Sequence, residues 1–430
     1  MTLNFRVLVV GFVILILVLL FLIFAETVEA ELNLSGNPLH GRAECNKIVF
    51  PETFGAEPNS TDNPLGIGAG YNTTNPLGIG AGYTTIVSTE TFGAEPNLTG
   101  NPIGGGEGYK DIISETDPRV KYVVSTKDQL LNALKRAKSG EIVFVKGNAN
   151  IDLTGTYATG IPGGVTLASD RGSNGSCGGR IFRDRLYPVT LENEYSKIQT
   201  FIINGDNVRI TGLRIEGPDK GQEALESKGI TVKSAFGAIG RSGLVFDNNE
   251  MWGWSFSAIN LMHSNTSVHH NYIHHCQVEG YGYSVNVGGG FTDIYANVFD
   301  YTRHAVCAGG LPGEMYNASY NIHLGHSTEH VFDVHPYTGI SPPIAGLRYY
   351  IHHNTIYPGI NFPLVRIQAV PVDKVYIYNN KFLASFPYAI SQYSLPPANY
   401  GNMSVTNNII GLNNEPGVYY ATGPVEYQSW

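Results

Sequence analysis

The chain contains few charged residues and few cysteines. Asp, Glu, Lys and Arg make up 15% of its 430 residues, against about 25% in an average globular protein. A net charge of −9 and the lack of a basic block argue against nucleic acid as a partner. The four cysteines are too few and too scattered for a disulfide scaffold or a CxxC metal site: Cys45, Cys177, Cys276 and Cys307.

Helical periodicity is also scarce, whereas glycine is abundant, with 51 residues. One amphipathic helix is predicted after the capping box that runs from Thr126 to Gln129, with an end at Gly140. Its apolar stripe consists of Leu130, Leu131, Leu134 and Ala137. A strand follows at 141–145, and almost no helical pattern occurs beyond it. Few charges and many turn residues therefore predict an all-β protein with one helix.

The N-terminus predicts export. Arg6 precedes an uninterrupted apolar run from Val7 to Ala25, and small residues around Ala30 suit signal peptidase. Residues 1–30 are therefore interpreted as a signal peptide, or as an uncleaved signal anchor, because the run approaches the ~20 residues of a membrane span. We expect a secreted or cell-surface glycoprotein, with membrane contact only through that anchor. Its Asn-x-Ser/Thr sequons are at Asn33, Asn59, Asn72, Asn97, Asn174, Asn265, Asn317 and Asn402.

Residues 31–109 form a Gly/Pro/Asn-rich repeat region. The repeated units are Glu52–Asn59 with Glu90–Asn97, and Asn63–Tyr71 with Asn75–Tyr83 and a degraded third copy, Asn101–Tyr109. These units have neither helical nor strand periodicity, so they cannot bury enough apolar surface to offset chain entropy. We expect a disordered, flexible, glycosylated stalk; a carbohydrate-binding repeat is the alternative. The third copy is expected to belong partly to the folded domain, which is assigned to residues 110–430.

A short pattern recurs through that domain: an alternating apolar strand, an Asn, and a second apolar pair. Its asparagines, spaced 22 to 33 residues apart, are Asn249, Asn271, Asn297, Asn321, Asn354, Asn380 and Asn408. Gly212 takes the Asn position in an earlier copy. Repeats of this length are typical of a solenoid whose every coil has two or three short strands. The Asn side chains are expected to stack into a hydrogen-bonded ladder along one corner.

On these features the chain resembles the right-handed parallel β-helix proteins of the pectin-lyase-like superfamily, over about residues 101–412. Two further segments carry the resemblance, 161–172 and 207–217. It implies a right-handed parallel β-helix (solenoid) with an N-terminal capping helix. Many members of the superfamily cleave acidic polysaccharides on the outer face of one parallel sheet, and others only bind, adhere or assemble. We find neither an aspartate trio for the calcium site of pectate lyases nor the paired aspartates of polygalacturonases, although 366–368 loosely resembles the basic motif of the latter.

Equal positions in successive coils stack, so candidate site residues can be placed by register. Aligning 283–287, 304–308, 330–335 and 365–368 predicts one outward column of Ser284, Cys307, Asp333 and Arg366. The neighbouring outward column is predicted to contain Asn286, Gly309, His335 and Gln368. Arg303, His304 and His330 lie at the preceding turn and are expected at the rim of the same patch.

The residue types of this patch suit β-elimination from a uronic acid, which needs a cation for the carboxylate, a base and an acid. Arg366 is predicted to bind the carboxylate, His335 or His330 to be the base, and Asp333 to orient it. Tyr283 or His304 is the candidate acid. Arg303, Asn286, Tyr283 and Gln368 are predicted to bind substrate. Hydrolysis, which requires two carboxylates, fits less well because only Asp333 is available, with Glu329 at its edge.

The sequence therefore predicts a protein that acts on an acidic polysaccharide or surface glycan. The alternative is a non-catalytic glycan-binding or structural envelope or adhesion protein that uses the same face. No calcium-site pattern is evident. A divalent metal is a further alternative, with the ligands His304, His330, Asp333 and His335.

Overall fold

The computed structural model describes residues 91–95, 99–184, 199–219, 234–383, 389–392, 401–411 and 421–422. The predicted signal segment and most of the predicted stalk lie outside these residues. In the part of the chain that is described, no helix is long and apolar enough to span a membrane.

The described strands form three all-parallel sheets, named A, B and C here, and from β2 onward each sheet takes every third strand. Sheet A contains β1 (Val120–Val124), β2 (Ile142–Val145), β5 (Thr166–Ala168), β8 (Arg209–Thr211), β11 (Leu244–Asp247), β14 (Thr266–His269), β17 (Phe291–Tyr295), β20 (Met315–Ser319), β23 (Arg348–His352), β26 (Lys374–Tyr378) and β29 (Met403–Thr406). Sheet B contains β3 (Asn150–Asp152), β6 (Arg180–Phe182), β9 (Arg214–Glu216), β12 (Glu250–Trp252), β15 (Tyr272–Cys276), β18 (Val298–Thr302), β21 (Ile322–His323), β24 (Thr355–Ile356), β27 (Lys381–Phe382) and β30 (Ile409–Ile410).

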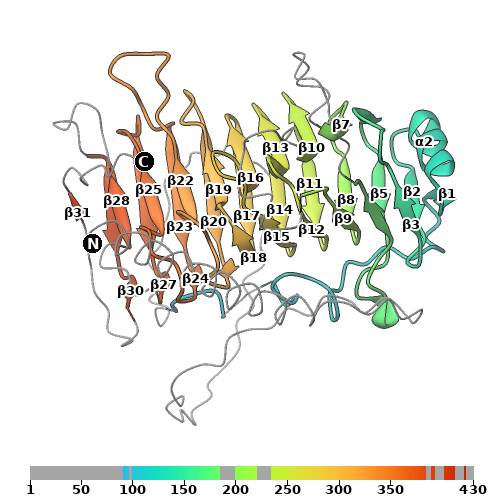
Figure 1. The fold of residues 1–430 in the computed structure, drawn as a ribbon, viewed down its shortest axis with the longest axis horizontal. Helices are drawn as coiled ribbons and strands as arrows, with labels where there is room; N and C mark the ends of the chain where they lie inside the picture. The colour runs from blue at the N-terminus through green and yellow to red at the C-terminus, as the bar shows by residue number, and fades with distance from the viewer. Residues whose placement is uncertain are drawn as a thin grey trace, which may run out of the picture. The chain divides into compact units, whose positions relative to one another are not determined.

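Sheet C carries the candidate site. Its strands are β4 (Thr159–Ile161), β7 (Gln199–Ile203), β10 (Ser234–Ile239), β13 (Ser257–Met262), β16 (Tyr283–Gly288), β19 (His304–Ala308), β22 (Phe332–Val334), β25 (Val365–Ile367), β28 (Ile390–Gln392) and β31 (Ala421–Thr422). One strand from each sheet makes a coil, and successive coils lie side by side (Figure 1). The predicted parallel β-helix is confirmed.

Helix α2 (Lys127–Arg136) lies at the N-terminal end of the coils (Figure 1). The Thr126 side chain accepts a hydrogen bond from the backbone N–H of Gln129, and the Gln129 side chain accepts one from the backbone N–H of Ser125. This exchange satisfies donors that the first helical turn leaves free. Leu130 and Leu134 are buried in the main apolar core. The predicted helix and its N-terminal cap are confirmed, but the helix ends at Arg136 and not at Gly140. It covers an end of the core that would otherwise meet water.

The predicted asparagine ladder lies at the corner between sheets A and B. Each of the six rungs from Asn249 to Asn380 donates from Nδ2 to Oδ1 of the Asn one coil further on, over 2.8–3.0 Å, and its backbone N–H donates to the same oxygen over 3.0–3.1 Å. The residue before each rung has a positive φ between 50° and 56°, at Asn248, His270, Ala296, Tyr320, His353, Asn379 and Asn407. The ladder thus holds seven non-glycine residues in the left-handed conformation, which non-glycine residues rarely adopt.

The last part of the predicted stalk packs on the coils, within residues 91–95 and 99–109. Ala94 is fully buried in a small apolar cluster with Tyr272, Val298, Ile322, Leu324 and Tyr357. Tyr109 is 5% exposed, and its hydroxyl donates to Asp247 over 2.9 Å. Arg171 donates to the carbonyl oxygen of Gly104 over 3.0 Å. The third repeat copy therefore contributes to the folded part, as the sequence predicts.

Candidate functional site

A column of polar side chains crosses the outer face of sheet C. Backbone pairing aligns Asn286 with Cys307, Cys307 with Asp333, and Asp333 with Arg366. Their strand neighbours are buried in the apolar core, for example Phe332 and Val334 on either side of Asp333. Because side chains alternate along a strand, the column faces away from the core. The prediction that Asp333 and Arg366 are outward neighbours is confirmed.

The predicted register of β16 is wrong by two residues. Ser284 was expected beside Cys307, but Asn286 takes that place, while Ser284 is fully buried. As a result, Asn286 belongs to the Asp333 column and not to the neighbouring column. A slip of two residues leaves every side chain on its original face, so hydrophobic alternation cannot distinguish the two registers. The predicted outward face of β16 is therefore correct, but the residue predicted to pair with Cys307 is wrong.

His304 and His330 were expected at the rim of the patch, but both are buried beneath this face. His304 is 0% and His330 is 3% exposed, and their rings stack at 5.8 Å between centroids. Nδ1 of His304 lies 2.7 Å from the carbonyl oxygen of His330, and Nδ1 of His330 lies 2.7 Å from that of Pro363. A carbonyl can only accept, so Nδ1 of each ring carries the proton. Each imidazole thus bridges one coil to the next, and neither is a surface group.

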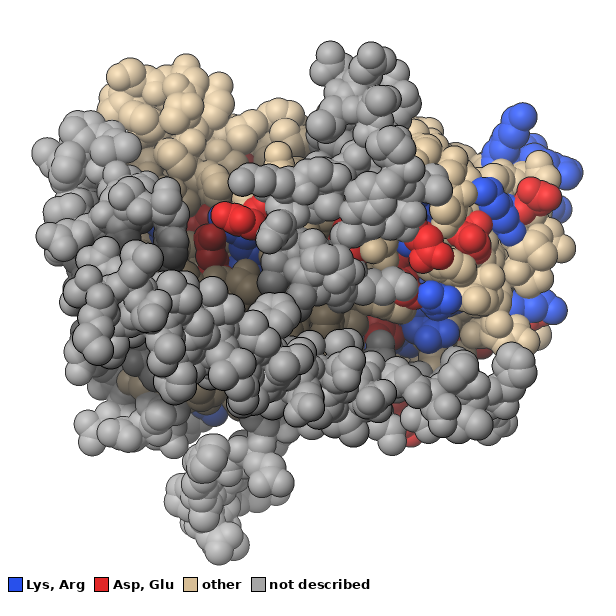
Figure 2. Space-filling view, in the orientation of Figure 1, with Lys and Arg blue, Asp and Glu red and all other residues tan. Residues whose placement is uncertain are grey.

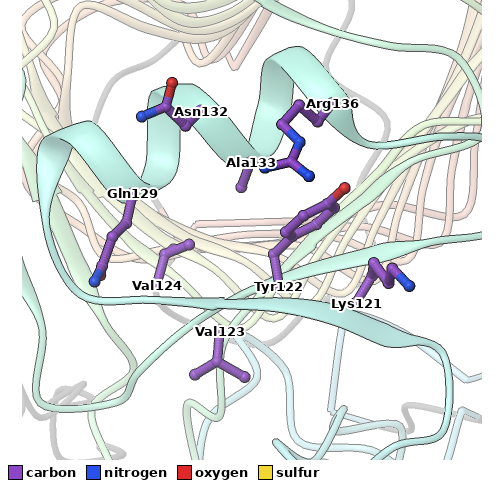
Figure 3. A pocket seen from close by; sticks show the side chains of 8 residues that line it. All are labelled: Lys121, Tyr122, Val123, Val124, Gln129, Asn132, Ala133 and Arg136. Carbon is purple, nitrogen blue, oxygen red and sulfur yellow. The ribbon is translucent and has the colours of Figure 1, made fainter.

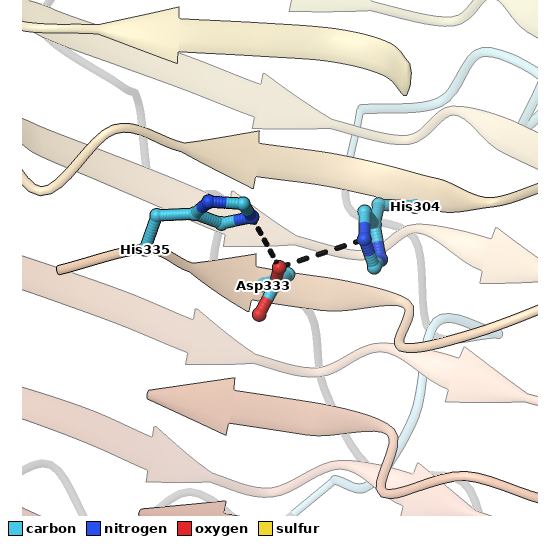
Figure 4. A group of neighbouring side chains, drawn as sticks. All are labelled: His304, Asp333 and His335. Atoms are coloured by element: carbon cyan, nitrogen blue, oxygen red, sulfur yellow. Dashed lines mark ion pairs between the residues drawn. The ribbon is translucent and has the colours of Figure 1, made fainter. Parts of the chain in front are cut away.

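Asp333 is the centre of the cluster (Figure 4). Its Oδ2 lies 2.7 Å from Nε2 of His335 and 3.5 Å from Nε2 of His304. Gln368 donates from Nε2 to both carboxylate oxygens, over 2.9 and 3.2 Å. His335 follows β22, and its side chain is 41% exposed, whereas the Asp333 side chain is 2% exposed. The structure thus places one accessible imidazole over a buried carboxylate.

The protonation states follow from these surroundings. Burial lowers the pKa of His304 to about 3, so this ring is neutral at pH 7. Burial also opposes ionisation of Asp333, but the surrounding histidines outweigh it and lower the pKa of its carboxyl group. Burial favours neutral His335 as well, yet the contacts with Asp333 and Cys307 raise the pKa of His335 to about 11. Because His304 is neutral, His335 supplies the positive charge that faces Asp333.

The remaining predicted site residues occupy the same region, with different partners. Nη1 of Arg366 donates to Nε2 of His330 over 2.9 Å, and Arg366 is partly exposed. Arg303 makes a two-point ion pair with Glu329, at 3.1 and 3.0 Å. Because Oε2 of Glu329 also lies 3.6 Å from Nε2 of His304, this ion pair adds a second arginine and a second carboxylate beside the His304 ring.

Two predicted substrate-binding residues show different accessibility. Tyr283 is 6% exposed, and its hydroxyl donates to the carbonyl oxygen of Gly280 over 3.2 Å. Burial raises the pKa of Tyr283, so its hydroxyl keeps its proton. Asn286 is partly exposed and donates from Nδ2 to Oδ1 of Asn260 over 2.9 Å. Asn286 is therefore the better placed of the two to meet a ligand.

The sequence interpretation missed two members of the column. Asn260 pairs with Asn286 on one side, and Ser391 pairs with Arg366 on the other. Asn260 precedes Asn286 by one coil, and this spacing was a usable signal. Ser391 lies one coil after Arg366, but the two residues differ in type, so no repeated residue marks it. The column therefore extends over more coils than predicted.

A groove of about 330 Å³ lies elsewhere, between β1 and α2 (Figure 3). Lys121, Tyr122, Gln129 and Arg136 are among its lining residues. Figure 2 shows basic side chains gathered over the same end of the coils. The guanidinium of Arg136 lies 6.0 Å from the centre of the Tyr122 ring, so two of the lining side chains interact with each other. It contains none of the clustered acids and histidines of sheet C.

Comparison of the sequence with protein-family models and with curated proteins found no match.

Proposed function

We propose that the protein acts on an acidic polysaccharide at the outer face of sheet C, by β-elimination at a uronate residue. The observation that supports this best is the placement of Arg366 and His335, both accessible, around the buried carboxylate of Asp333. A polymer of uronates offers a carboxylate for Arg366 and an acidic C–H bond next to it. The resemblance to the pectin-lyase-like superfamily, many of whose members cleave acidic polysaccharides on such a face, supports the same substrate class.

Each residue has a distinct part in the proposed reaction. The guanidinium of Arg366 binds the substrate carboxylate and stabilises the charge that develops on it. His335 removes the proton from the carbon next to the substrate carboxylate; it does so in its neutral form, after it has released the proton that pairs it with Asp333. The C–H electron pair forms the new C=C bond as the bond to the glycosidic oxygen breaks, and the proton is returned to that oxygen. Asp333 holds the imidazole ring of His335 in position, and Gln368 holds the carboxylate of Asp333.

A single imidazole serves both as base and as acid in this scheme. His304 and His330 are buried, and both commit Nδ1 to a backbone carbonyl, so His335 is the accessible histidine of the cluster. One group can perform both proton transfers when the proton and the leaving oxygen lie on the same side of the sugar ring. We therefore expect syn elimination.

The second candidate function is binding of an acidic glycan without cleavage. Its support is the ion pair between His335 and Asp333, because a histidine that is held as an imidazolium binds an anion well but removes a proton poorly. Both candidates use the same face and the same class of ligand. They differ in whether a bond is broken.

The test is incubation of the full chain with polymers of galacturonate, glucuronate, mannuronate and guluronate. Elimination produces ultraviolet absorbance from the new C=C bond together with reducing ends, whereas hydrolysis produces reducing ends alone. Binding measured by co-sedimentation, with neither product, supports the second candidate. Failure to bind any of these polymers would overturn both.

Arg366→Lys is the informative variant. A lysine keeps the charge but loses the planar two-point grip, so turnover is expected to fall roughly 100-fold. The matched control is Arg348→Lys in β23 of sheet A, where the arginine is also partly exposed and pairs with Asp373. The control is expected to keep wild-type turnover. Equal turnover in the two variants would remove Arg366 from the mechanism.

A further inference from the structure

His304 has a buried nitrogen that the cluster leaves without a hydrogen-bond partner. Its Nδ1–H donates to the carbonyl oxygen of His330, which fixes the tautomer and leaves a lone pair on Nε2. Among the described residues no hydrogen bond reaches this Nε2, and the side chain has no solvent exposure. A buried acceptor of this kind costs free energy unless a donor or a cation meets it.

The groups that face Nε2 of His304 are also acceptors. Oδ2 of Asp333 lies 3.5 Å away and Oε2 of Glu329 lies 3.6 Å away, both too far for a good N–H···O bond. Arg303 already neutralises Glu329 through two contacts. The carboxylate of Asp333 therefore faces the lone pair of His304 Nε2. A cation bound between them would interact favourably with both the carboxylate and the lone pair.

His330 provides an internal comparison. Its Nδ1 donates to a backbone carbonyl as that of His304 does, but its Nε2 accepts a hydrogen bond from Arg366. Of these two equivalent rings, only His304 therefore presents an unpartnered lone pair. The four-ligand metal set considered from the sequence thus loses His330.

We propose that His304, Asp333 and His335 bind one divalent transition-metal ion, with Zn²⁺ as the best match. One ligand atom from each residue lies within 4.8 Å of the others. Ligands ~2.0–2.1 Å from a tetrahedral metal are about 3.3 Å apart, close to the 3.5 Å between His304 and Asp333. The 2.7 Å between His335 and Asp333 must widen, and His335 can move because it is half-exposed.

The surroundings resemble those that orient metal ligands elsewhere. A ligating histidine usually donates its other ring N–H to a carbonyl or carboxylate, as His304 does to His330. Gln368 holds the Asp333 carboxylate through both oxygens. With three protein ligands, the fourth position of a tetrahedral ion is open on the His335 side, where the cluster meets solvent. Binding of the ion at this cluster does not require that the protein catalyses β-elimination.

The test is calorimetric titration of the chelator-treated full chain with Zn²⁺, with Co²⁺ as a spectroscopic probe of coordination. The wild type is expected to bind one ion per chain, and Co²⁺ to give the strong visible absorption of a tetrahedral site. His335→Ala is expected to weaken binding at least about 100-fold, and Gln368→Ala roughly 10- to 100-fold. Both substitutions remove partly exposed side chains, so the fold is expected to persist even where a His304 variant does not fold.

The matched control is His352→Ala, which removes a partly exposed histidine from β23 of sheet A. It is expected to bind Zn²⁺ like the wild type. The proposal is overturned if the wild type binds no ion, or if His335→Ala binds as tightly as His352→Ala. Because the readout is binding, an inactive but metal-binding chain would support this site while contradicting the proposed elimination.

Discussion

Glu314 shows how strongly a single buried carboxyl group can couple the fold to pH. It has no solvent exposure, and its Oε1 accepts hydrogen bonds from the backbone N–H of Gly310 and the hydroxyl of Tyr349, both over 2.8 Å. Burial nevertheless raises the pKa of Glu314 to about 7. An acid with a higher pKa in the folded chain binds its proton more tightly when folded. Its contribution to stability is therefore lost as pH rises from the unfolded value towards 7.

We expect Glu314→Gln to remove this pH dependence. Between pH 4.5 and pH 8 the free energy of unfolding of the wild type should fall relative to that of the variant, by up to about 3 kcal/mol. Urea unfolding of both proteins at a series of pH values measures the difference, with other titrating groups common to both. A constant difference across this pH range would show that Glu314 keeps an ordinary pKa in the folded protein.

At the scale of elements, the Asn ladder fixes the register between neighbouring strands, which apolar packing alone specifies less strictly. Asn297 in its middle accepts from the N–H and Nδ2 of Asn271 and donates to Asn321 and to the carbonyl oxygen of Val268. All three asparagines are buried, so water cannot replace these bonds. The ladder thus fixes the corner at which the chain passes from sheet A to sheet B.

Asn297→Ala is expected to lower the free energy of unfolding by roughly 3 kcal/mol or more, because it leaves several buried groups unpaired. The control is Asn317→Ala in β20, where a partly exposed Asn donates to Asp293 over 2.8 Å and water can replace the lost bond. The control should cost less than about 1 kcal/mol. Equal losses in thermal or urea unfolding would mean that the ladder adds nothing beyond an ordinary surface contact.

How far the sequence predicts such elements depends on whether the signal repeats. The rungs could be found because each Asn recurs at coil spacing, and the helix because Thr126 and Gln129 form a local cap. The partner of Cys307 could not be found, since Ser284 and Asn286 lie two residues apart on the same face of the strand, and hydrophobic alternation cannot distinguish them. The burial of His304 was also missed, because its bond to the carbonyl of His330 depends on how two coils stack and leaves no mark in the sequence.

At the scale of the molecule, the segment before the helix binds coils that are distant in sequence. The hydroxyl of Thr355 contacts Glu95, and the N–H of Gly106 donates to Asn248 over 2.7 Å. The turn-rich composition of this segment predicts a stalk. Composition cannot show that Ala94 packs in an apolar cluster on the coils, or that Tyr109 hydrogen-bonds Asp247 there. The folded part therefore begins earlier than its own periodicity indicates.

A comparison of two shortened chains tests this role. A chain that starts at residue 110 should unfold at a temperature several degrees below one that starts at residue 91, and should bind more of a hydrophobic dye. The reason is that removal of 91–109 exposes the cluster around Tyr272 and Tyr357 and leaves Asp247 without the Tyr109 hydroxyl. Both chains lack residues 1–90, so the difference belongs to this segment. Identical melting curves would show that it is not needed.

The ladder also determines how such a protein can lengthen during evolution. Each rung makes the same bonds to the rung before and after it, so duplication of one whole coil inserts a rung and leaves the bonds of its neighbours unchanged. Insertion of a coil between those of His304 and Asp333, or between those of Asp333 and Arg366, would instead put an extra strand between these side chains. Relatives with more or fewer coils should therefore differ outside this span and keep the adjacency of its three strands.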